Sequence, residues 1–118
     1  MLNQNKDNQY LFWNVDEALN TVDGDKDLLK DIIEIFLEDY PRIMEQVSDA
    51  IKKKDGVELE RATHQLKGSV SNFSAKGTVE LAACLVVKGE NIDLTDSAEV
   101  FVQLQEELKH LEDELRNF

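Results

Sequence analysis

The chain has 118 residues, with 25 acidic and 13 basic side chains and a formal net charge of −12. This charge argues against nucleic acid and anionic membrane surfaces as partners, because both bind to basic faces. The length suffices for one domain with its own core, and no apolar stretch approaches the roughly 18–20 residues of a membrane span. The single cysteine, Cys84, excludes an intrachain disulfide, and its apolar neighbours predict a core position.

The N-terminal residues carry no periodic pattern. We expect residues 1–11 to form a polar, disordered tail and residues 12–118 to form one helical domain. Asn14 is a good N-cap, and the acidic residues Asp16 and Glu17 suit the first turn of a helix. A short helix is therefore expected directly after Asn14.

The strongest periodic pattern runs from Leu28 to Ile51, with apolar residues recurring every three to four positions. Asp25 can cap its start, and lysines 52–54 suit the negative end of the helix dipole. Pro41 interrupts the pattern, but no cluster of loop-forming residues surrounds it. We therefore predict one long helix over residues 26–53, kinked at Pro41.

The pattern of the remaining chain also predicts helices. We predict helices over residues 57–72 and 76–87, with residues 88–91 ending the second, and a long leucine-rich helix from about residue 98 to 115. No strand-like alternation competes with this reading. The expected fold is all-α: an antiparallel four-helix bundle, with the short first helix capping one end.

The helix around His64 has one apolar side. At 3.6 residues per turn that side consists of Leu59, Ala62, Thr63, Leu66, Val70 and Phe73. His64 lies more than a quarter-turn from the centre of this stripe, in the same sector as Lys67, Gly68 and Ser71. A solvated surface histidine is the simplest interpretation.

Two neighbours of His64 point to a chemical role instead. Lys67, at i+3, can reach an anion attached to the imidazole through charge-assisted hydrogen bonds. Gly68, at i+4, costs about 1 kcal/mol relative to alanine inside a helix, which suggests that another surface must approach closely there. Ser69 and Ser71 also have small side chains, so the next turn of the helix leaves further room for an approaching surface. Together they describe an accessible nitrogen nucleophile with room for a second protein.

Metal and enzyme sites are not indicated by the sequence. The two histidines, His64 and His110, have no His or Cys partner at i+3 or i+4, and the Glu107–His110 spacing occurs once, beside the leucine seam. No phosphate-binding loop, nucleophile elbow or kinase signature is present. We expect no metal and no cofactor of the chain's own.

The stretch from His64 to Ala75, His-Gln-Leu-Lys-Gly-Ser-Val-Ser-Asn-Phe-Ser-Ala, resembles the signature of histidine-containing phosphotransfer (HPt) domains, the relay modules of multistep two-component signalling. The order of the predicted helices matches that family over about residues 12–118. The resemblance implies a kinked antiparallel four-helix bundle in which the outward ring nitrogen of His64 accepts the phosphoryl group. Lys67 would stabilise that group, and Gly68 would clear space for a receiver domain.

Two positions depart from the family pattern. Ser74 stands where the family usually has glycine. Val86 stands where many members carry Glu or Gln to orient the histidine. Gln65, Glu60 and water are the alternatives for that orienting contact.

The resemblance implies a phosphoryl carrier that takes the group from a receiver aspartate and passes it to another receiver. Such a carrier is not an enzyme, lacks autokinase activity and uses the Mg²⁺ of its partner. We expect response-regulator receivers and a sensor histidine kinase as partners, contacting Arg61, Gln65, Ser71 and Lys76. A cytoplasmic domain that is monomeric in isolation is expected, and we expect it to be a fragment of the cytoplasmic C-terminal part of a membrane-anchored hybrid kinase. The alternative is a non-catalytic helical adaptor module.

Overall fold

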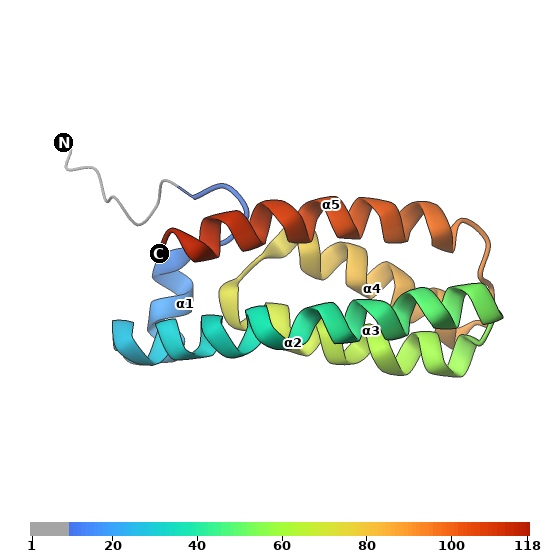
Figure 1. Ribbon diagram of the computed structural model, residues 1–118, viewed down its shortest axis with the longest axis horizontal. Helices are drawn as coiled ribbons and strands as arrows, with labels where there is room; N and C mark the ends of the chain where they lie inside the picture. Colours follow the sequence, from blue (N-terminus) through green and yellow to red (C-terminus); the bar gives the residue numbers. More distant parts are fainter. Residues whose placement is uncertain (1–9) are drawn as a thin grey trace.

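The computed structural model describes residues 10–118, so predictions for residues 1–9 fall outside the described residues. The element order is α1 (Val15–Thr21), α2 (Lys26–Lys53), α3 (Gly56–Val70), the 3-10 turn η2 (Ser71–Phe73), α4 (Lys76–Glu90) and α5 (Ser97–Arg116). All regular structure in this part of the chain is helical, which confirms the all-α prediction. Figure 1 shows the four longer helices extended along the molecule and α1 at one end.

Three of the helices begin with a side-chain cap. Asn14, Asp25 and Asp55 each accept a hydrogen bond from the backbone N–H three residues later. Such caps satisfy one of the N–H groups that a helix start leaves without a partner. The predicted starts at Asn14 and Asp25 are therefore confirmed.

Pro41 does not divide α2. The helix continues from Lys26 to Lys53 with the proline inside it, over the predicted residues. A kink at Pro41 stays a prediction. The length of α2 matters because this helix packs along α3 and also reaches α5.

The end of α4 differs from the prediction, which ended the helix at residue 87. Gly89 lies inside α4, where a Cβ would stand only 2.7 Å from the backbone oxygen of Gly56. Glycine is thus required by the close approach of α3 and α4 and does not end the helix. The helix ends at Glu90, and beyond it the N–H groups of Ile92 and Asp93 donate to the carbonyls of Gly89 and Lys88 at 3.1 and 3.0 Å.

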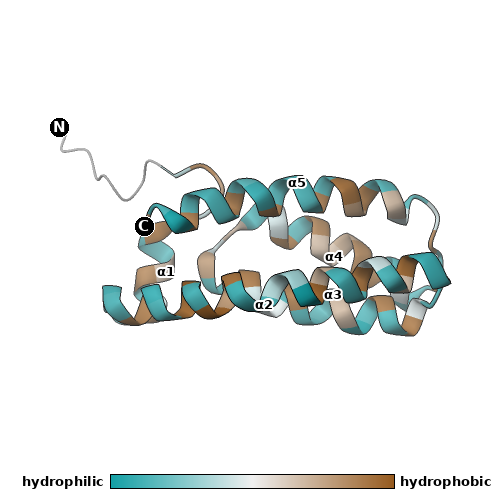
Figure 2. Cartoon of the chain, viewed as in Figure 1, coloured by the Kyte–Doolittle hydropathy of each residue, from teal (hydrophilic) through white to brown (hydrophobic). Residues whose placement is uncertain are grey.

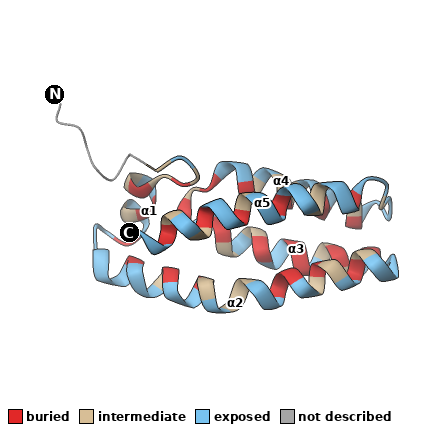
Figure 3. Ribbon diagram, turned by 45° about the horizontal axis from the view of Figure 1, so that its top comes forward, coloured by how far each residue is buried: buried red, intermediate tan, exposed pale blue. Residues whose placement is uncertain are grey.

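Cys84 is exposed, which contradicts its predicted core position. The apolar run around it belongs to a helix that is apolar on several sides, so the run does not reveal which residues face inward. Ala82 and Leu85 take the buried positions. Figures 2 and 3 show this pattern along the bundle: hydrophobic residues occur on several sides, whereas buried ones concentrate between helices.

The segment before α1 is attached to the bundle. The N–H groups of Leu11 and Phe12 donate to the Glu114 carboxylate of α5, at 3.0 and 2.8 Å. Trp13 is buried against Phe73, with ring centroids 6.0 Å apart. Residues 10 and 11 of the predicted tail therefore contact the folded domain, and η2 is held from the N-terminal side.

A polar contact links α2 and α5. The Tyr40 hydroxyl donates to the carboxylate of Glu112, which also accepts from Arg116. The Tyr40 hydrogen bond is the main cause that lowers the pKa of Glu112, against the opposing effect of partial burial. Burial, followed by the hydrogen bond to Glu112, raises the pKa of Tyr40.

We predict that Tyr40→Phe lowers stability by about 1 kcal/mol at neutral pH, the usual worth of one hydrogen bond. Because the pKa of Glu112 is lowered on folding, its contribution exists above the ordinary carboxyl pKa and disappears as pH falls through the lowered value. The difference between wild type and variant should therefore shrink as the pH falls below the ordinary carboxyl pKa. Urea unfolding at neutral pH and at acid pH measures it.

Tyr10→Phe is the matched control. Its hydroxyl donates to the backbone carbonyl of Asn117 at 2.9 Å, a group that does not titrate. Its effect should not depend on pH. An equal pH dependence for both variants would contradict the role given to Glu112.

Candidate functional site

The rotation of α3 about its axis is fixed by its buried side. The buried residues of α3 and η2 include all those predicted for the apolar stripe, which are Leu59, Ala62, Thr63, Leu66, Val70 and Phe73. The hydroxyl of Thr63, the polar member, donates to the carbonyl of Leu59 at 2.6 Å. The one polar side chain of the buried stripe thus has a hydrogen-bond partner. The opposite side of α3 must therefore face solvent.

His64 lies on that solvent side and is exposed, as predicted. Within residues 10–118 its imidazole makes no hydrogen bond or ion pair. Its ring nitrogens are therefore accessible to a second molecule. An imidazole in this state can act as a nucleophile and hold a group covalently.

Lys67 is the nearest cation along the helix. It lies one turn after His64 and is half-buried, and its ammonium forms no ion pair among the described residues. Side chains three positions apart on a helix are neighbours, so the ammonium can reach an anion on the imidazole. The backbone carbonyl of Lys67 accepts a hydrogen bond from the hydroxyl of Ser71 at 2.7 Å.

Gly68 has open space beside it. A Cβ built on Gly68 meets no atom within 4 Å, whereas one built on Gly56, Gly77 or Gly89 comes within 3.0 Å of another group. Those three glycines are explained by contacts inside the domain. Gly68 is not, so the gap that it leaves on the surface fits the approach of another molecule.

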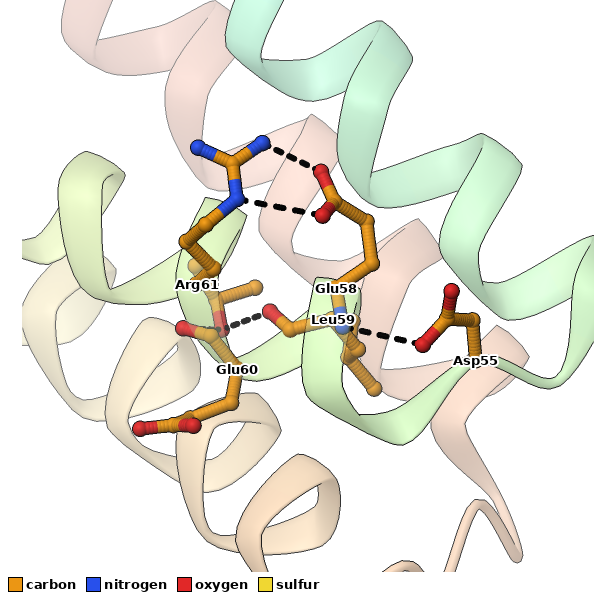
Figure 4. Close-up of polar contacts among 6 residues, drawn as sticks. Asp55, Glu58, Leu59, Glu60 and Arg61 are labelled. Atoms are coloured by element: carbon orange, nitrogen blue, oxygen red, sulfur yellow. Dashed lines mark hydrogen bonds and ion pairs between the residues drawn. The ribbon is translucent and has the colours of Figure 1, made fainter.

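Arg61 is exposed, and its guanidinium bonds the carboxylate of Glu58, as Figure 4 shows. This contact lowers the pKa of Glu58 and raises that of Arg61. The positive charge predicted at Arg61 for a partner is therefore shared with a neighbouring carboxylate. Such an exposed pair is easily exchanged for contacts with a partner.

Of the other predicted contact residues, Gln65 is exposed beside His64. Ser71 and Lys76 come together across η2, where they line a hollow of about 360 Å³ with Ser74 and Val79. The site residues therefore extend from α3 over its C-terminal turn to the start of α4.

The two departures from the family pattern have structural counterparts. Ser74 has φ 52°, a left-handed conformation that glycine adopts most easily. Val86 is buried on α4 and offers no polar atom. Neither Gln65 nor Glu60 hydrogen-bonds His64, so no described side chain orients the imidazole.

Val57 is not among the site residues predicted from the sequence. This residue lies seven positions before His64, close to two full turns, and is therefore on the same side of α3. It is 71% exposed. The seven-residue spacing was the signal that could have identified it.

Among the described residues, no group of three or more His, Cys, Asp or Glu side chains is placed to hold a metal ion. None of the helices over residues 10–118 has the length and apolar character needed to cross a membrane.

A comparison with protein families matches residues 31–115 to the family described as "Hpt domain". The match includes His64 and most of the chain. No curated protein and no solved structure matches the chain.

We predict opposite stability effects for two helical glycines. Gly68→Ala should stabilise the domain by up to about 1 kcal/mol, because alanine favours the helix and its Cβ enters open space. Gly89→Ala should destabilise it by about 1–3 kcal/mol, because its Cβ meets the backbone of α3. Denaturant unfolding compares them. A Gly68→Ala variant as unstable as Gly89→Ala would contradict the open space at Gly68.

Proposed function

Since the chain belongs to the Hpt domain family, a class of phosphotransfer signalling modules, we propose that His64 is its phosphoacceptor. Hpt domains are phosphocarriers that interact with receiver domains. The finer proposal is a reversible relay, in which His64 takes the group from one receiver aspartate and passes it to another.

In the proposed transfer, the lone pair of the outward ring nitrogen attacks the phosphorus of a receiver aspartyl phosphate. A nitrogen–phosphorus bond forms as the phosphorus–oxygen bond breaks, and the aspartate leaves as a carboxylate. The proton stays on the other ring nitrogen. The reverse steps, with a second receiver, release the imidazole unchanged.

The work of catalysis is divided between the partners. The receiver supplies Mg²⁺ and most of the stabilisation of the transferring group, while this chain supplies a positioned nucleophile and the Lys67 ammonium. The open space at Gly68 lets the receiver approach. With Val86 on α4 and no hydrogen bond to His64, the imidazole takes its final orientation only in the complex.

One observation favours His64 over His110, the other histidine, as the phosphoacceptor. The imidazole of His110 stacks on Phe12, with ring centroids 4.7 Å apart and an interplanar angle of 12°. It thereby helps to hold the segment before α1. Within residues 10–118, His64 has no comparable ring contact, and the neighbouring Lys67 ammonium forms no ion pair there, as expected of groups that must meet a partner.

Further details belong to the same proposal. The long helices form an antiparallel four-helix bundle with α2 kinked at Pro41, and the isolated domain is monomeric. The receiver contacts Arg61, Gln65, Ser71 and Lys76 around His64. As a member of a family of phosphocarriers, the chain is proposed to be a carrier without autokinase activity.

We predict that wild type, but not His64→Gln, acquires an acid-labile phosphoryl group from a phosphorylated receiver domain. His110→Gln is the control, since it removes the other imidazole and should leave labelling unchanged. Radiolabel transfer on neutral gels measures all three. Equal labelling of wild type and His64→Gln, or no labelling of wild type by any receiver of the source genome, would reject the proposal.

Lys67→Ala should keep the fold but slow transfer by about 10- to 100-fold, the value of one charge-assisted hydrogen bond to the phosphoryl group. Lys67→Arg should retain part of the rate because it keeps the charge. Stopped-time transfer assays and thermal unfolding provide the two readouts. If Lys67→Ala unfolds the domain, Lys67 has a structural role and this assignment is wrong.

A further inference from the structure

An exposed apolar side chain lies on the His64 side of α3. Val57, in the first turn of the helix, is 71% exposed. Valine is a mediocre helix former, and at this exposure it gains little from burial inside its own domain. The local structure thus gives no reason for an apolar residue here.

Ile92, directly after α4, is a second unexplained apolar residue. It has φ 51° and is 72% exposed. It occupies the position after the helix end at which glycine or asparagine is usual, because a left-handed backbone brings Cβ close to the next carbonyl oxygen. A β-branched residue is especially unfavourable there, and burial does not compensate for it. Such an outlier suggests a functional demand.

The two residues lie at the same end of the domain. A Cβ on Gly56 would stand 3.4 Å from the Cα of Ile92 and 3.5 Å from its Cγ1, so Ile92 passes beside the residue that precedes Val57. We call Val57 and Ile92 the apolar end patch. Between this patch and His64, Arg61 is bonded to Glu58. The charge of Arg61 is therefore paired locally, and the other charge between the patch and the histidine is the carboxylate of Glu60, whose Cβ lies against Gly89 of α4.

The distance between the patch and His64 suits one partner. Seven residues of helix span roughly 10 Å. A typical interface buries about 800 Å² on each partner, which corresponds to a disc of roughly 16 Å radius. An interface of this size centred on His64 therefore reaches Val57 along the helix, and Ile92 lies beside Gly56, the residue before Val57.

We propose that the apolar end patch contacts the receiver domain that exchanges a phosphoryl group with His64, and so helps to determine which receivers are served. This inference rests on the proposed function of His64. The contact lies outside the reacting atoms. It therefore contributes to association of the two proteins and leaves the chemical step unchanged.

The test uses Val57→Ser and Ile92→Asn, with Val102→Ser as the matched control. Val102 is also an exposed valine, at 53%, but it lies on α5, which packs mainly against α4 and α2. Serine removes the apolar surface without adding charge, and asparagine tolerates the left-handed backbone at position 92. The phosphoryl donor is a receiver domain that has been phosphorylated with acetyl phosphate. Among the receiver domains of the source genome, the one that transfers fastest to the wild-type chain is used.

Val57→Ser and Ile92→Asn should each slow transfer about five-fold at limiting receiver, as expected for a lost apolar contact. The rate at saturating receiver should stay unchanged, and Val102→Ser should match wild type. Ile92→Asn should unfold at the same temperature as wild type or higher, because strain is relieved. This combination would separate a docking role from a structural one.

Normal transfer by Val57→Ser and Ile92→Asn would overturn the inference, as would a loss that follows a lowered unfolding temperature. In both cases wild type still transfers, so the proposed function stands. Labelling with phosphoramidate, which needs no docking surface, gives the separate check on His64. Failure of wild-type labelling by phosphoramidate and by all receivers would overturn the proposed function and the patch together.

Discussion

The close approach of α3 and α4 is the contact on which the site depends. Where Gly89 faces α3, a side chain would stand 2.7 Å from both the amide nitrogen of Glu60 and the oxygen of Gly56. Only glycine permits this spacing. With its buried stripe turned towards its neighbours, α3 has a fixed rotation, and His64 one turn after Glu60 is held on the solvent side.

Both ends of α3 are secured as well. Asp55 caps its start, while at its other end Phe73 packs against Trp13 and accepts a hydrogen bond from the N–H of Asn14 at 3.1 Å. The left-handed Ser74 then turns the chain into α4. A nucleophile on such a helix needs few contacts of its own, because the scaffold positions it. This explains how His64 can be fixed in place although its imidazole forms no hydrogen bond or ion pair within residues 10–118.

Much of this was predictable from the sequence. Helical periodicity alone placed His64, Lys67 and Gly68 on the exposed side, and the absence of loop residues around Pro41 predicted a single α2. These features depend on local spacing. The exposure of Cys84 and the inclusion of Gly89 in α4 were not predicted, because both depend on which side of α4 meets α3. A left-handed Ile92 contradicts its own propensity, so no sequence rule indicates it.

The central claim is that the phosphoryl group is carried by the imidazole that the packing of α3 leaves free. Mass spectrometry of the intact domain and of its peptides, at neutral pH after incubation with a phosphorylated receiver, tests this most directly. We expect one added phosphoryl group, located on His64 and lost in acid. A stable phosphoryl group on a serine, or an acid-labile one on His110, would contradict the account.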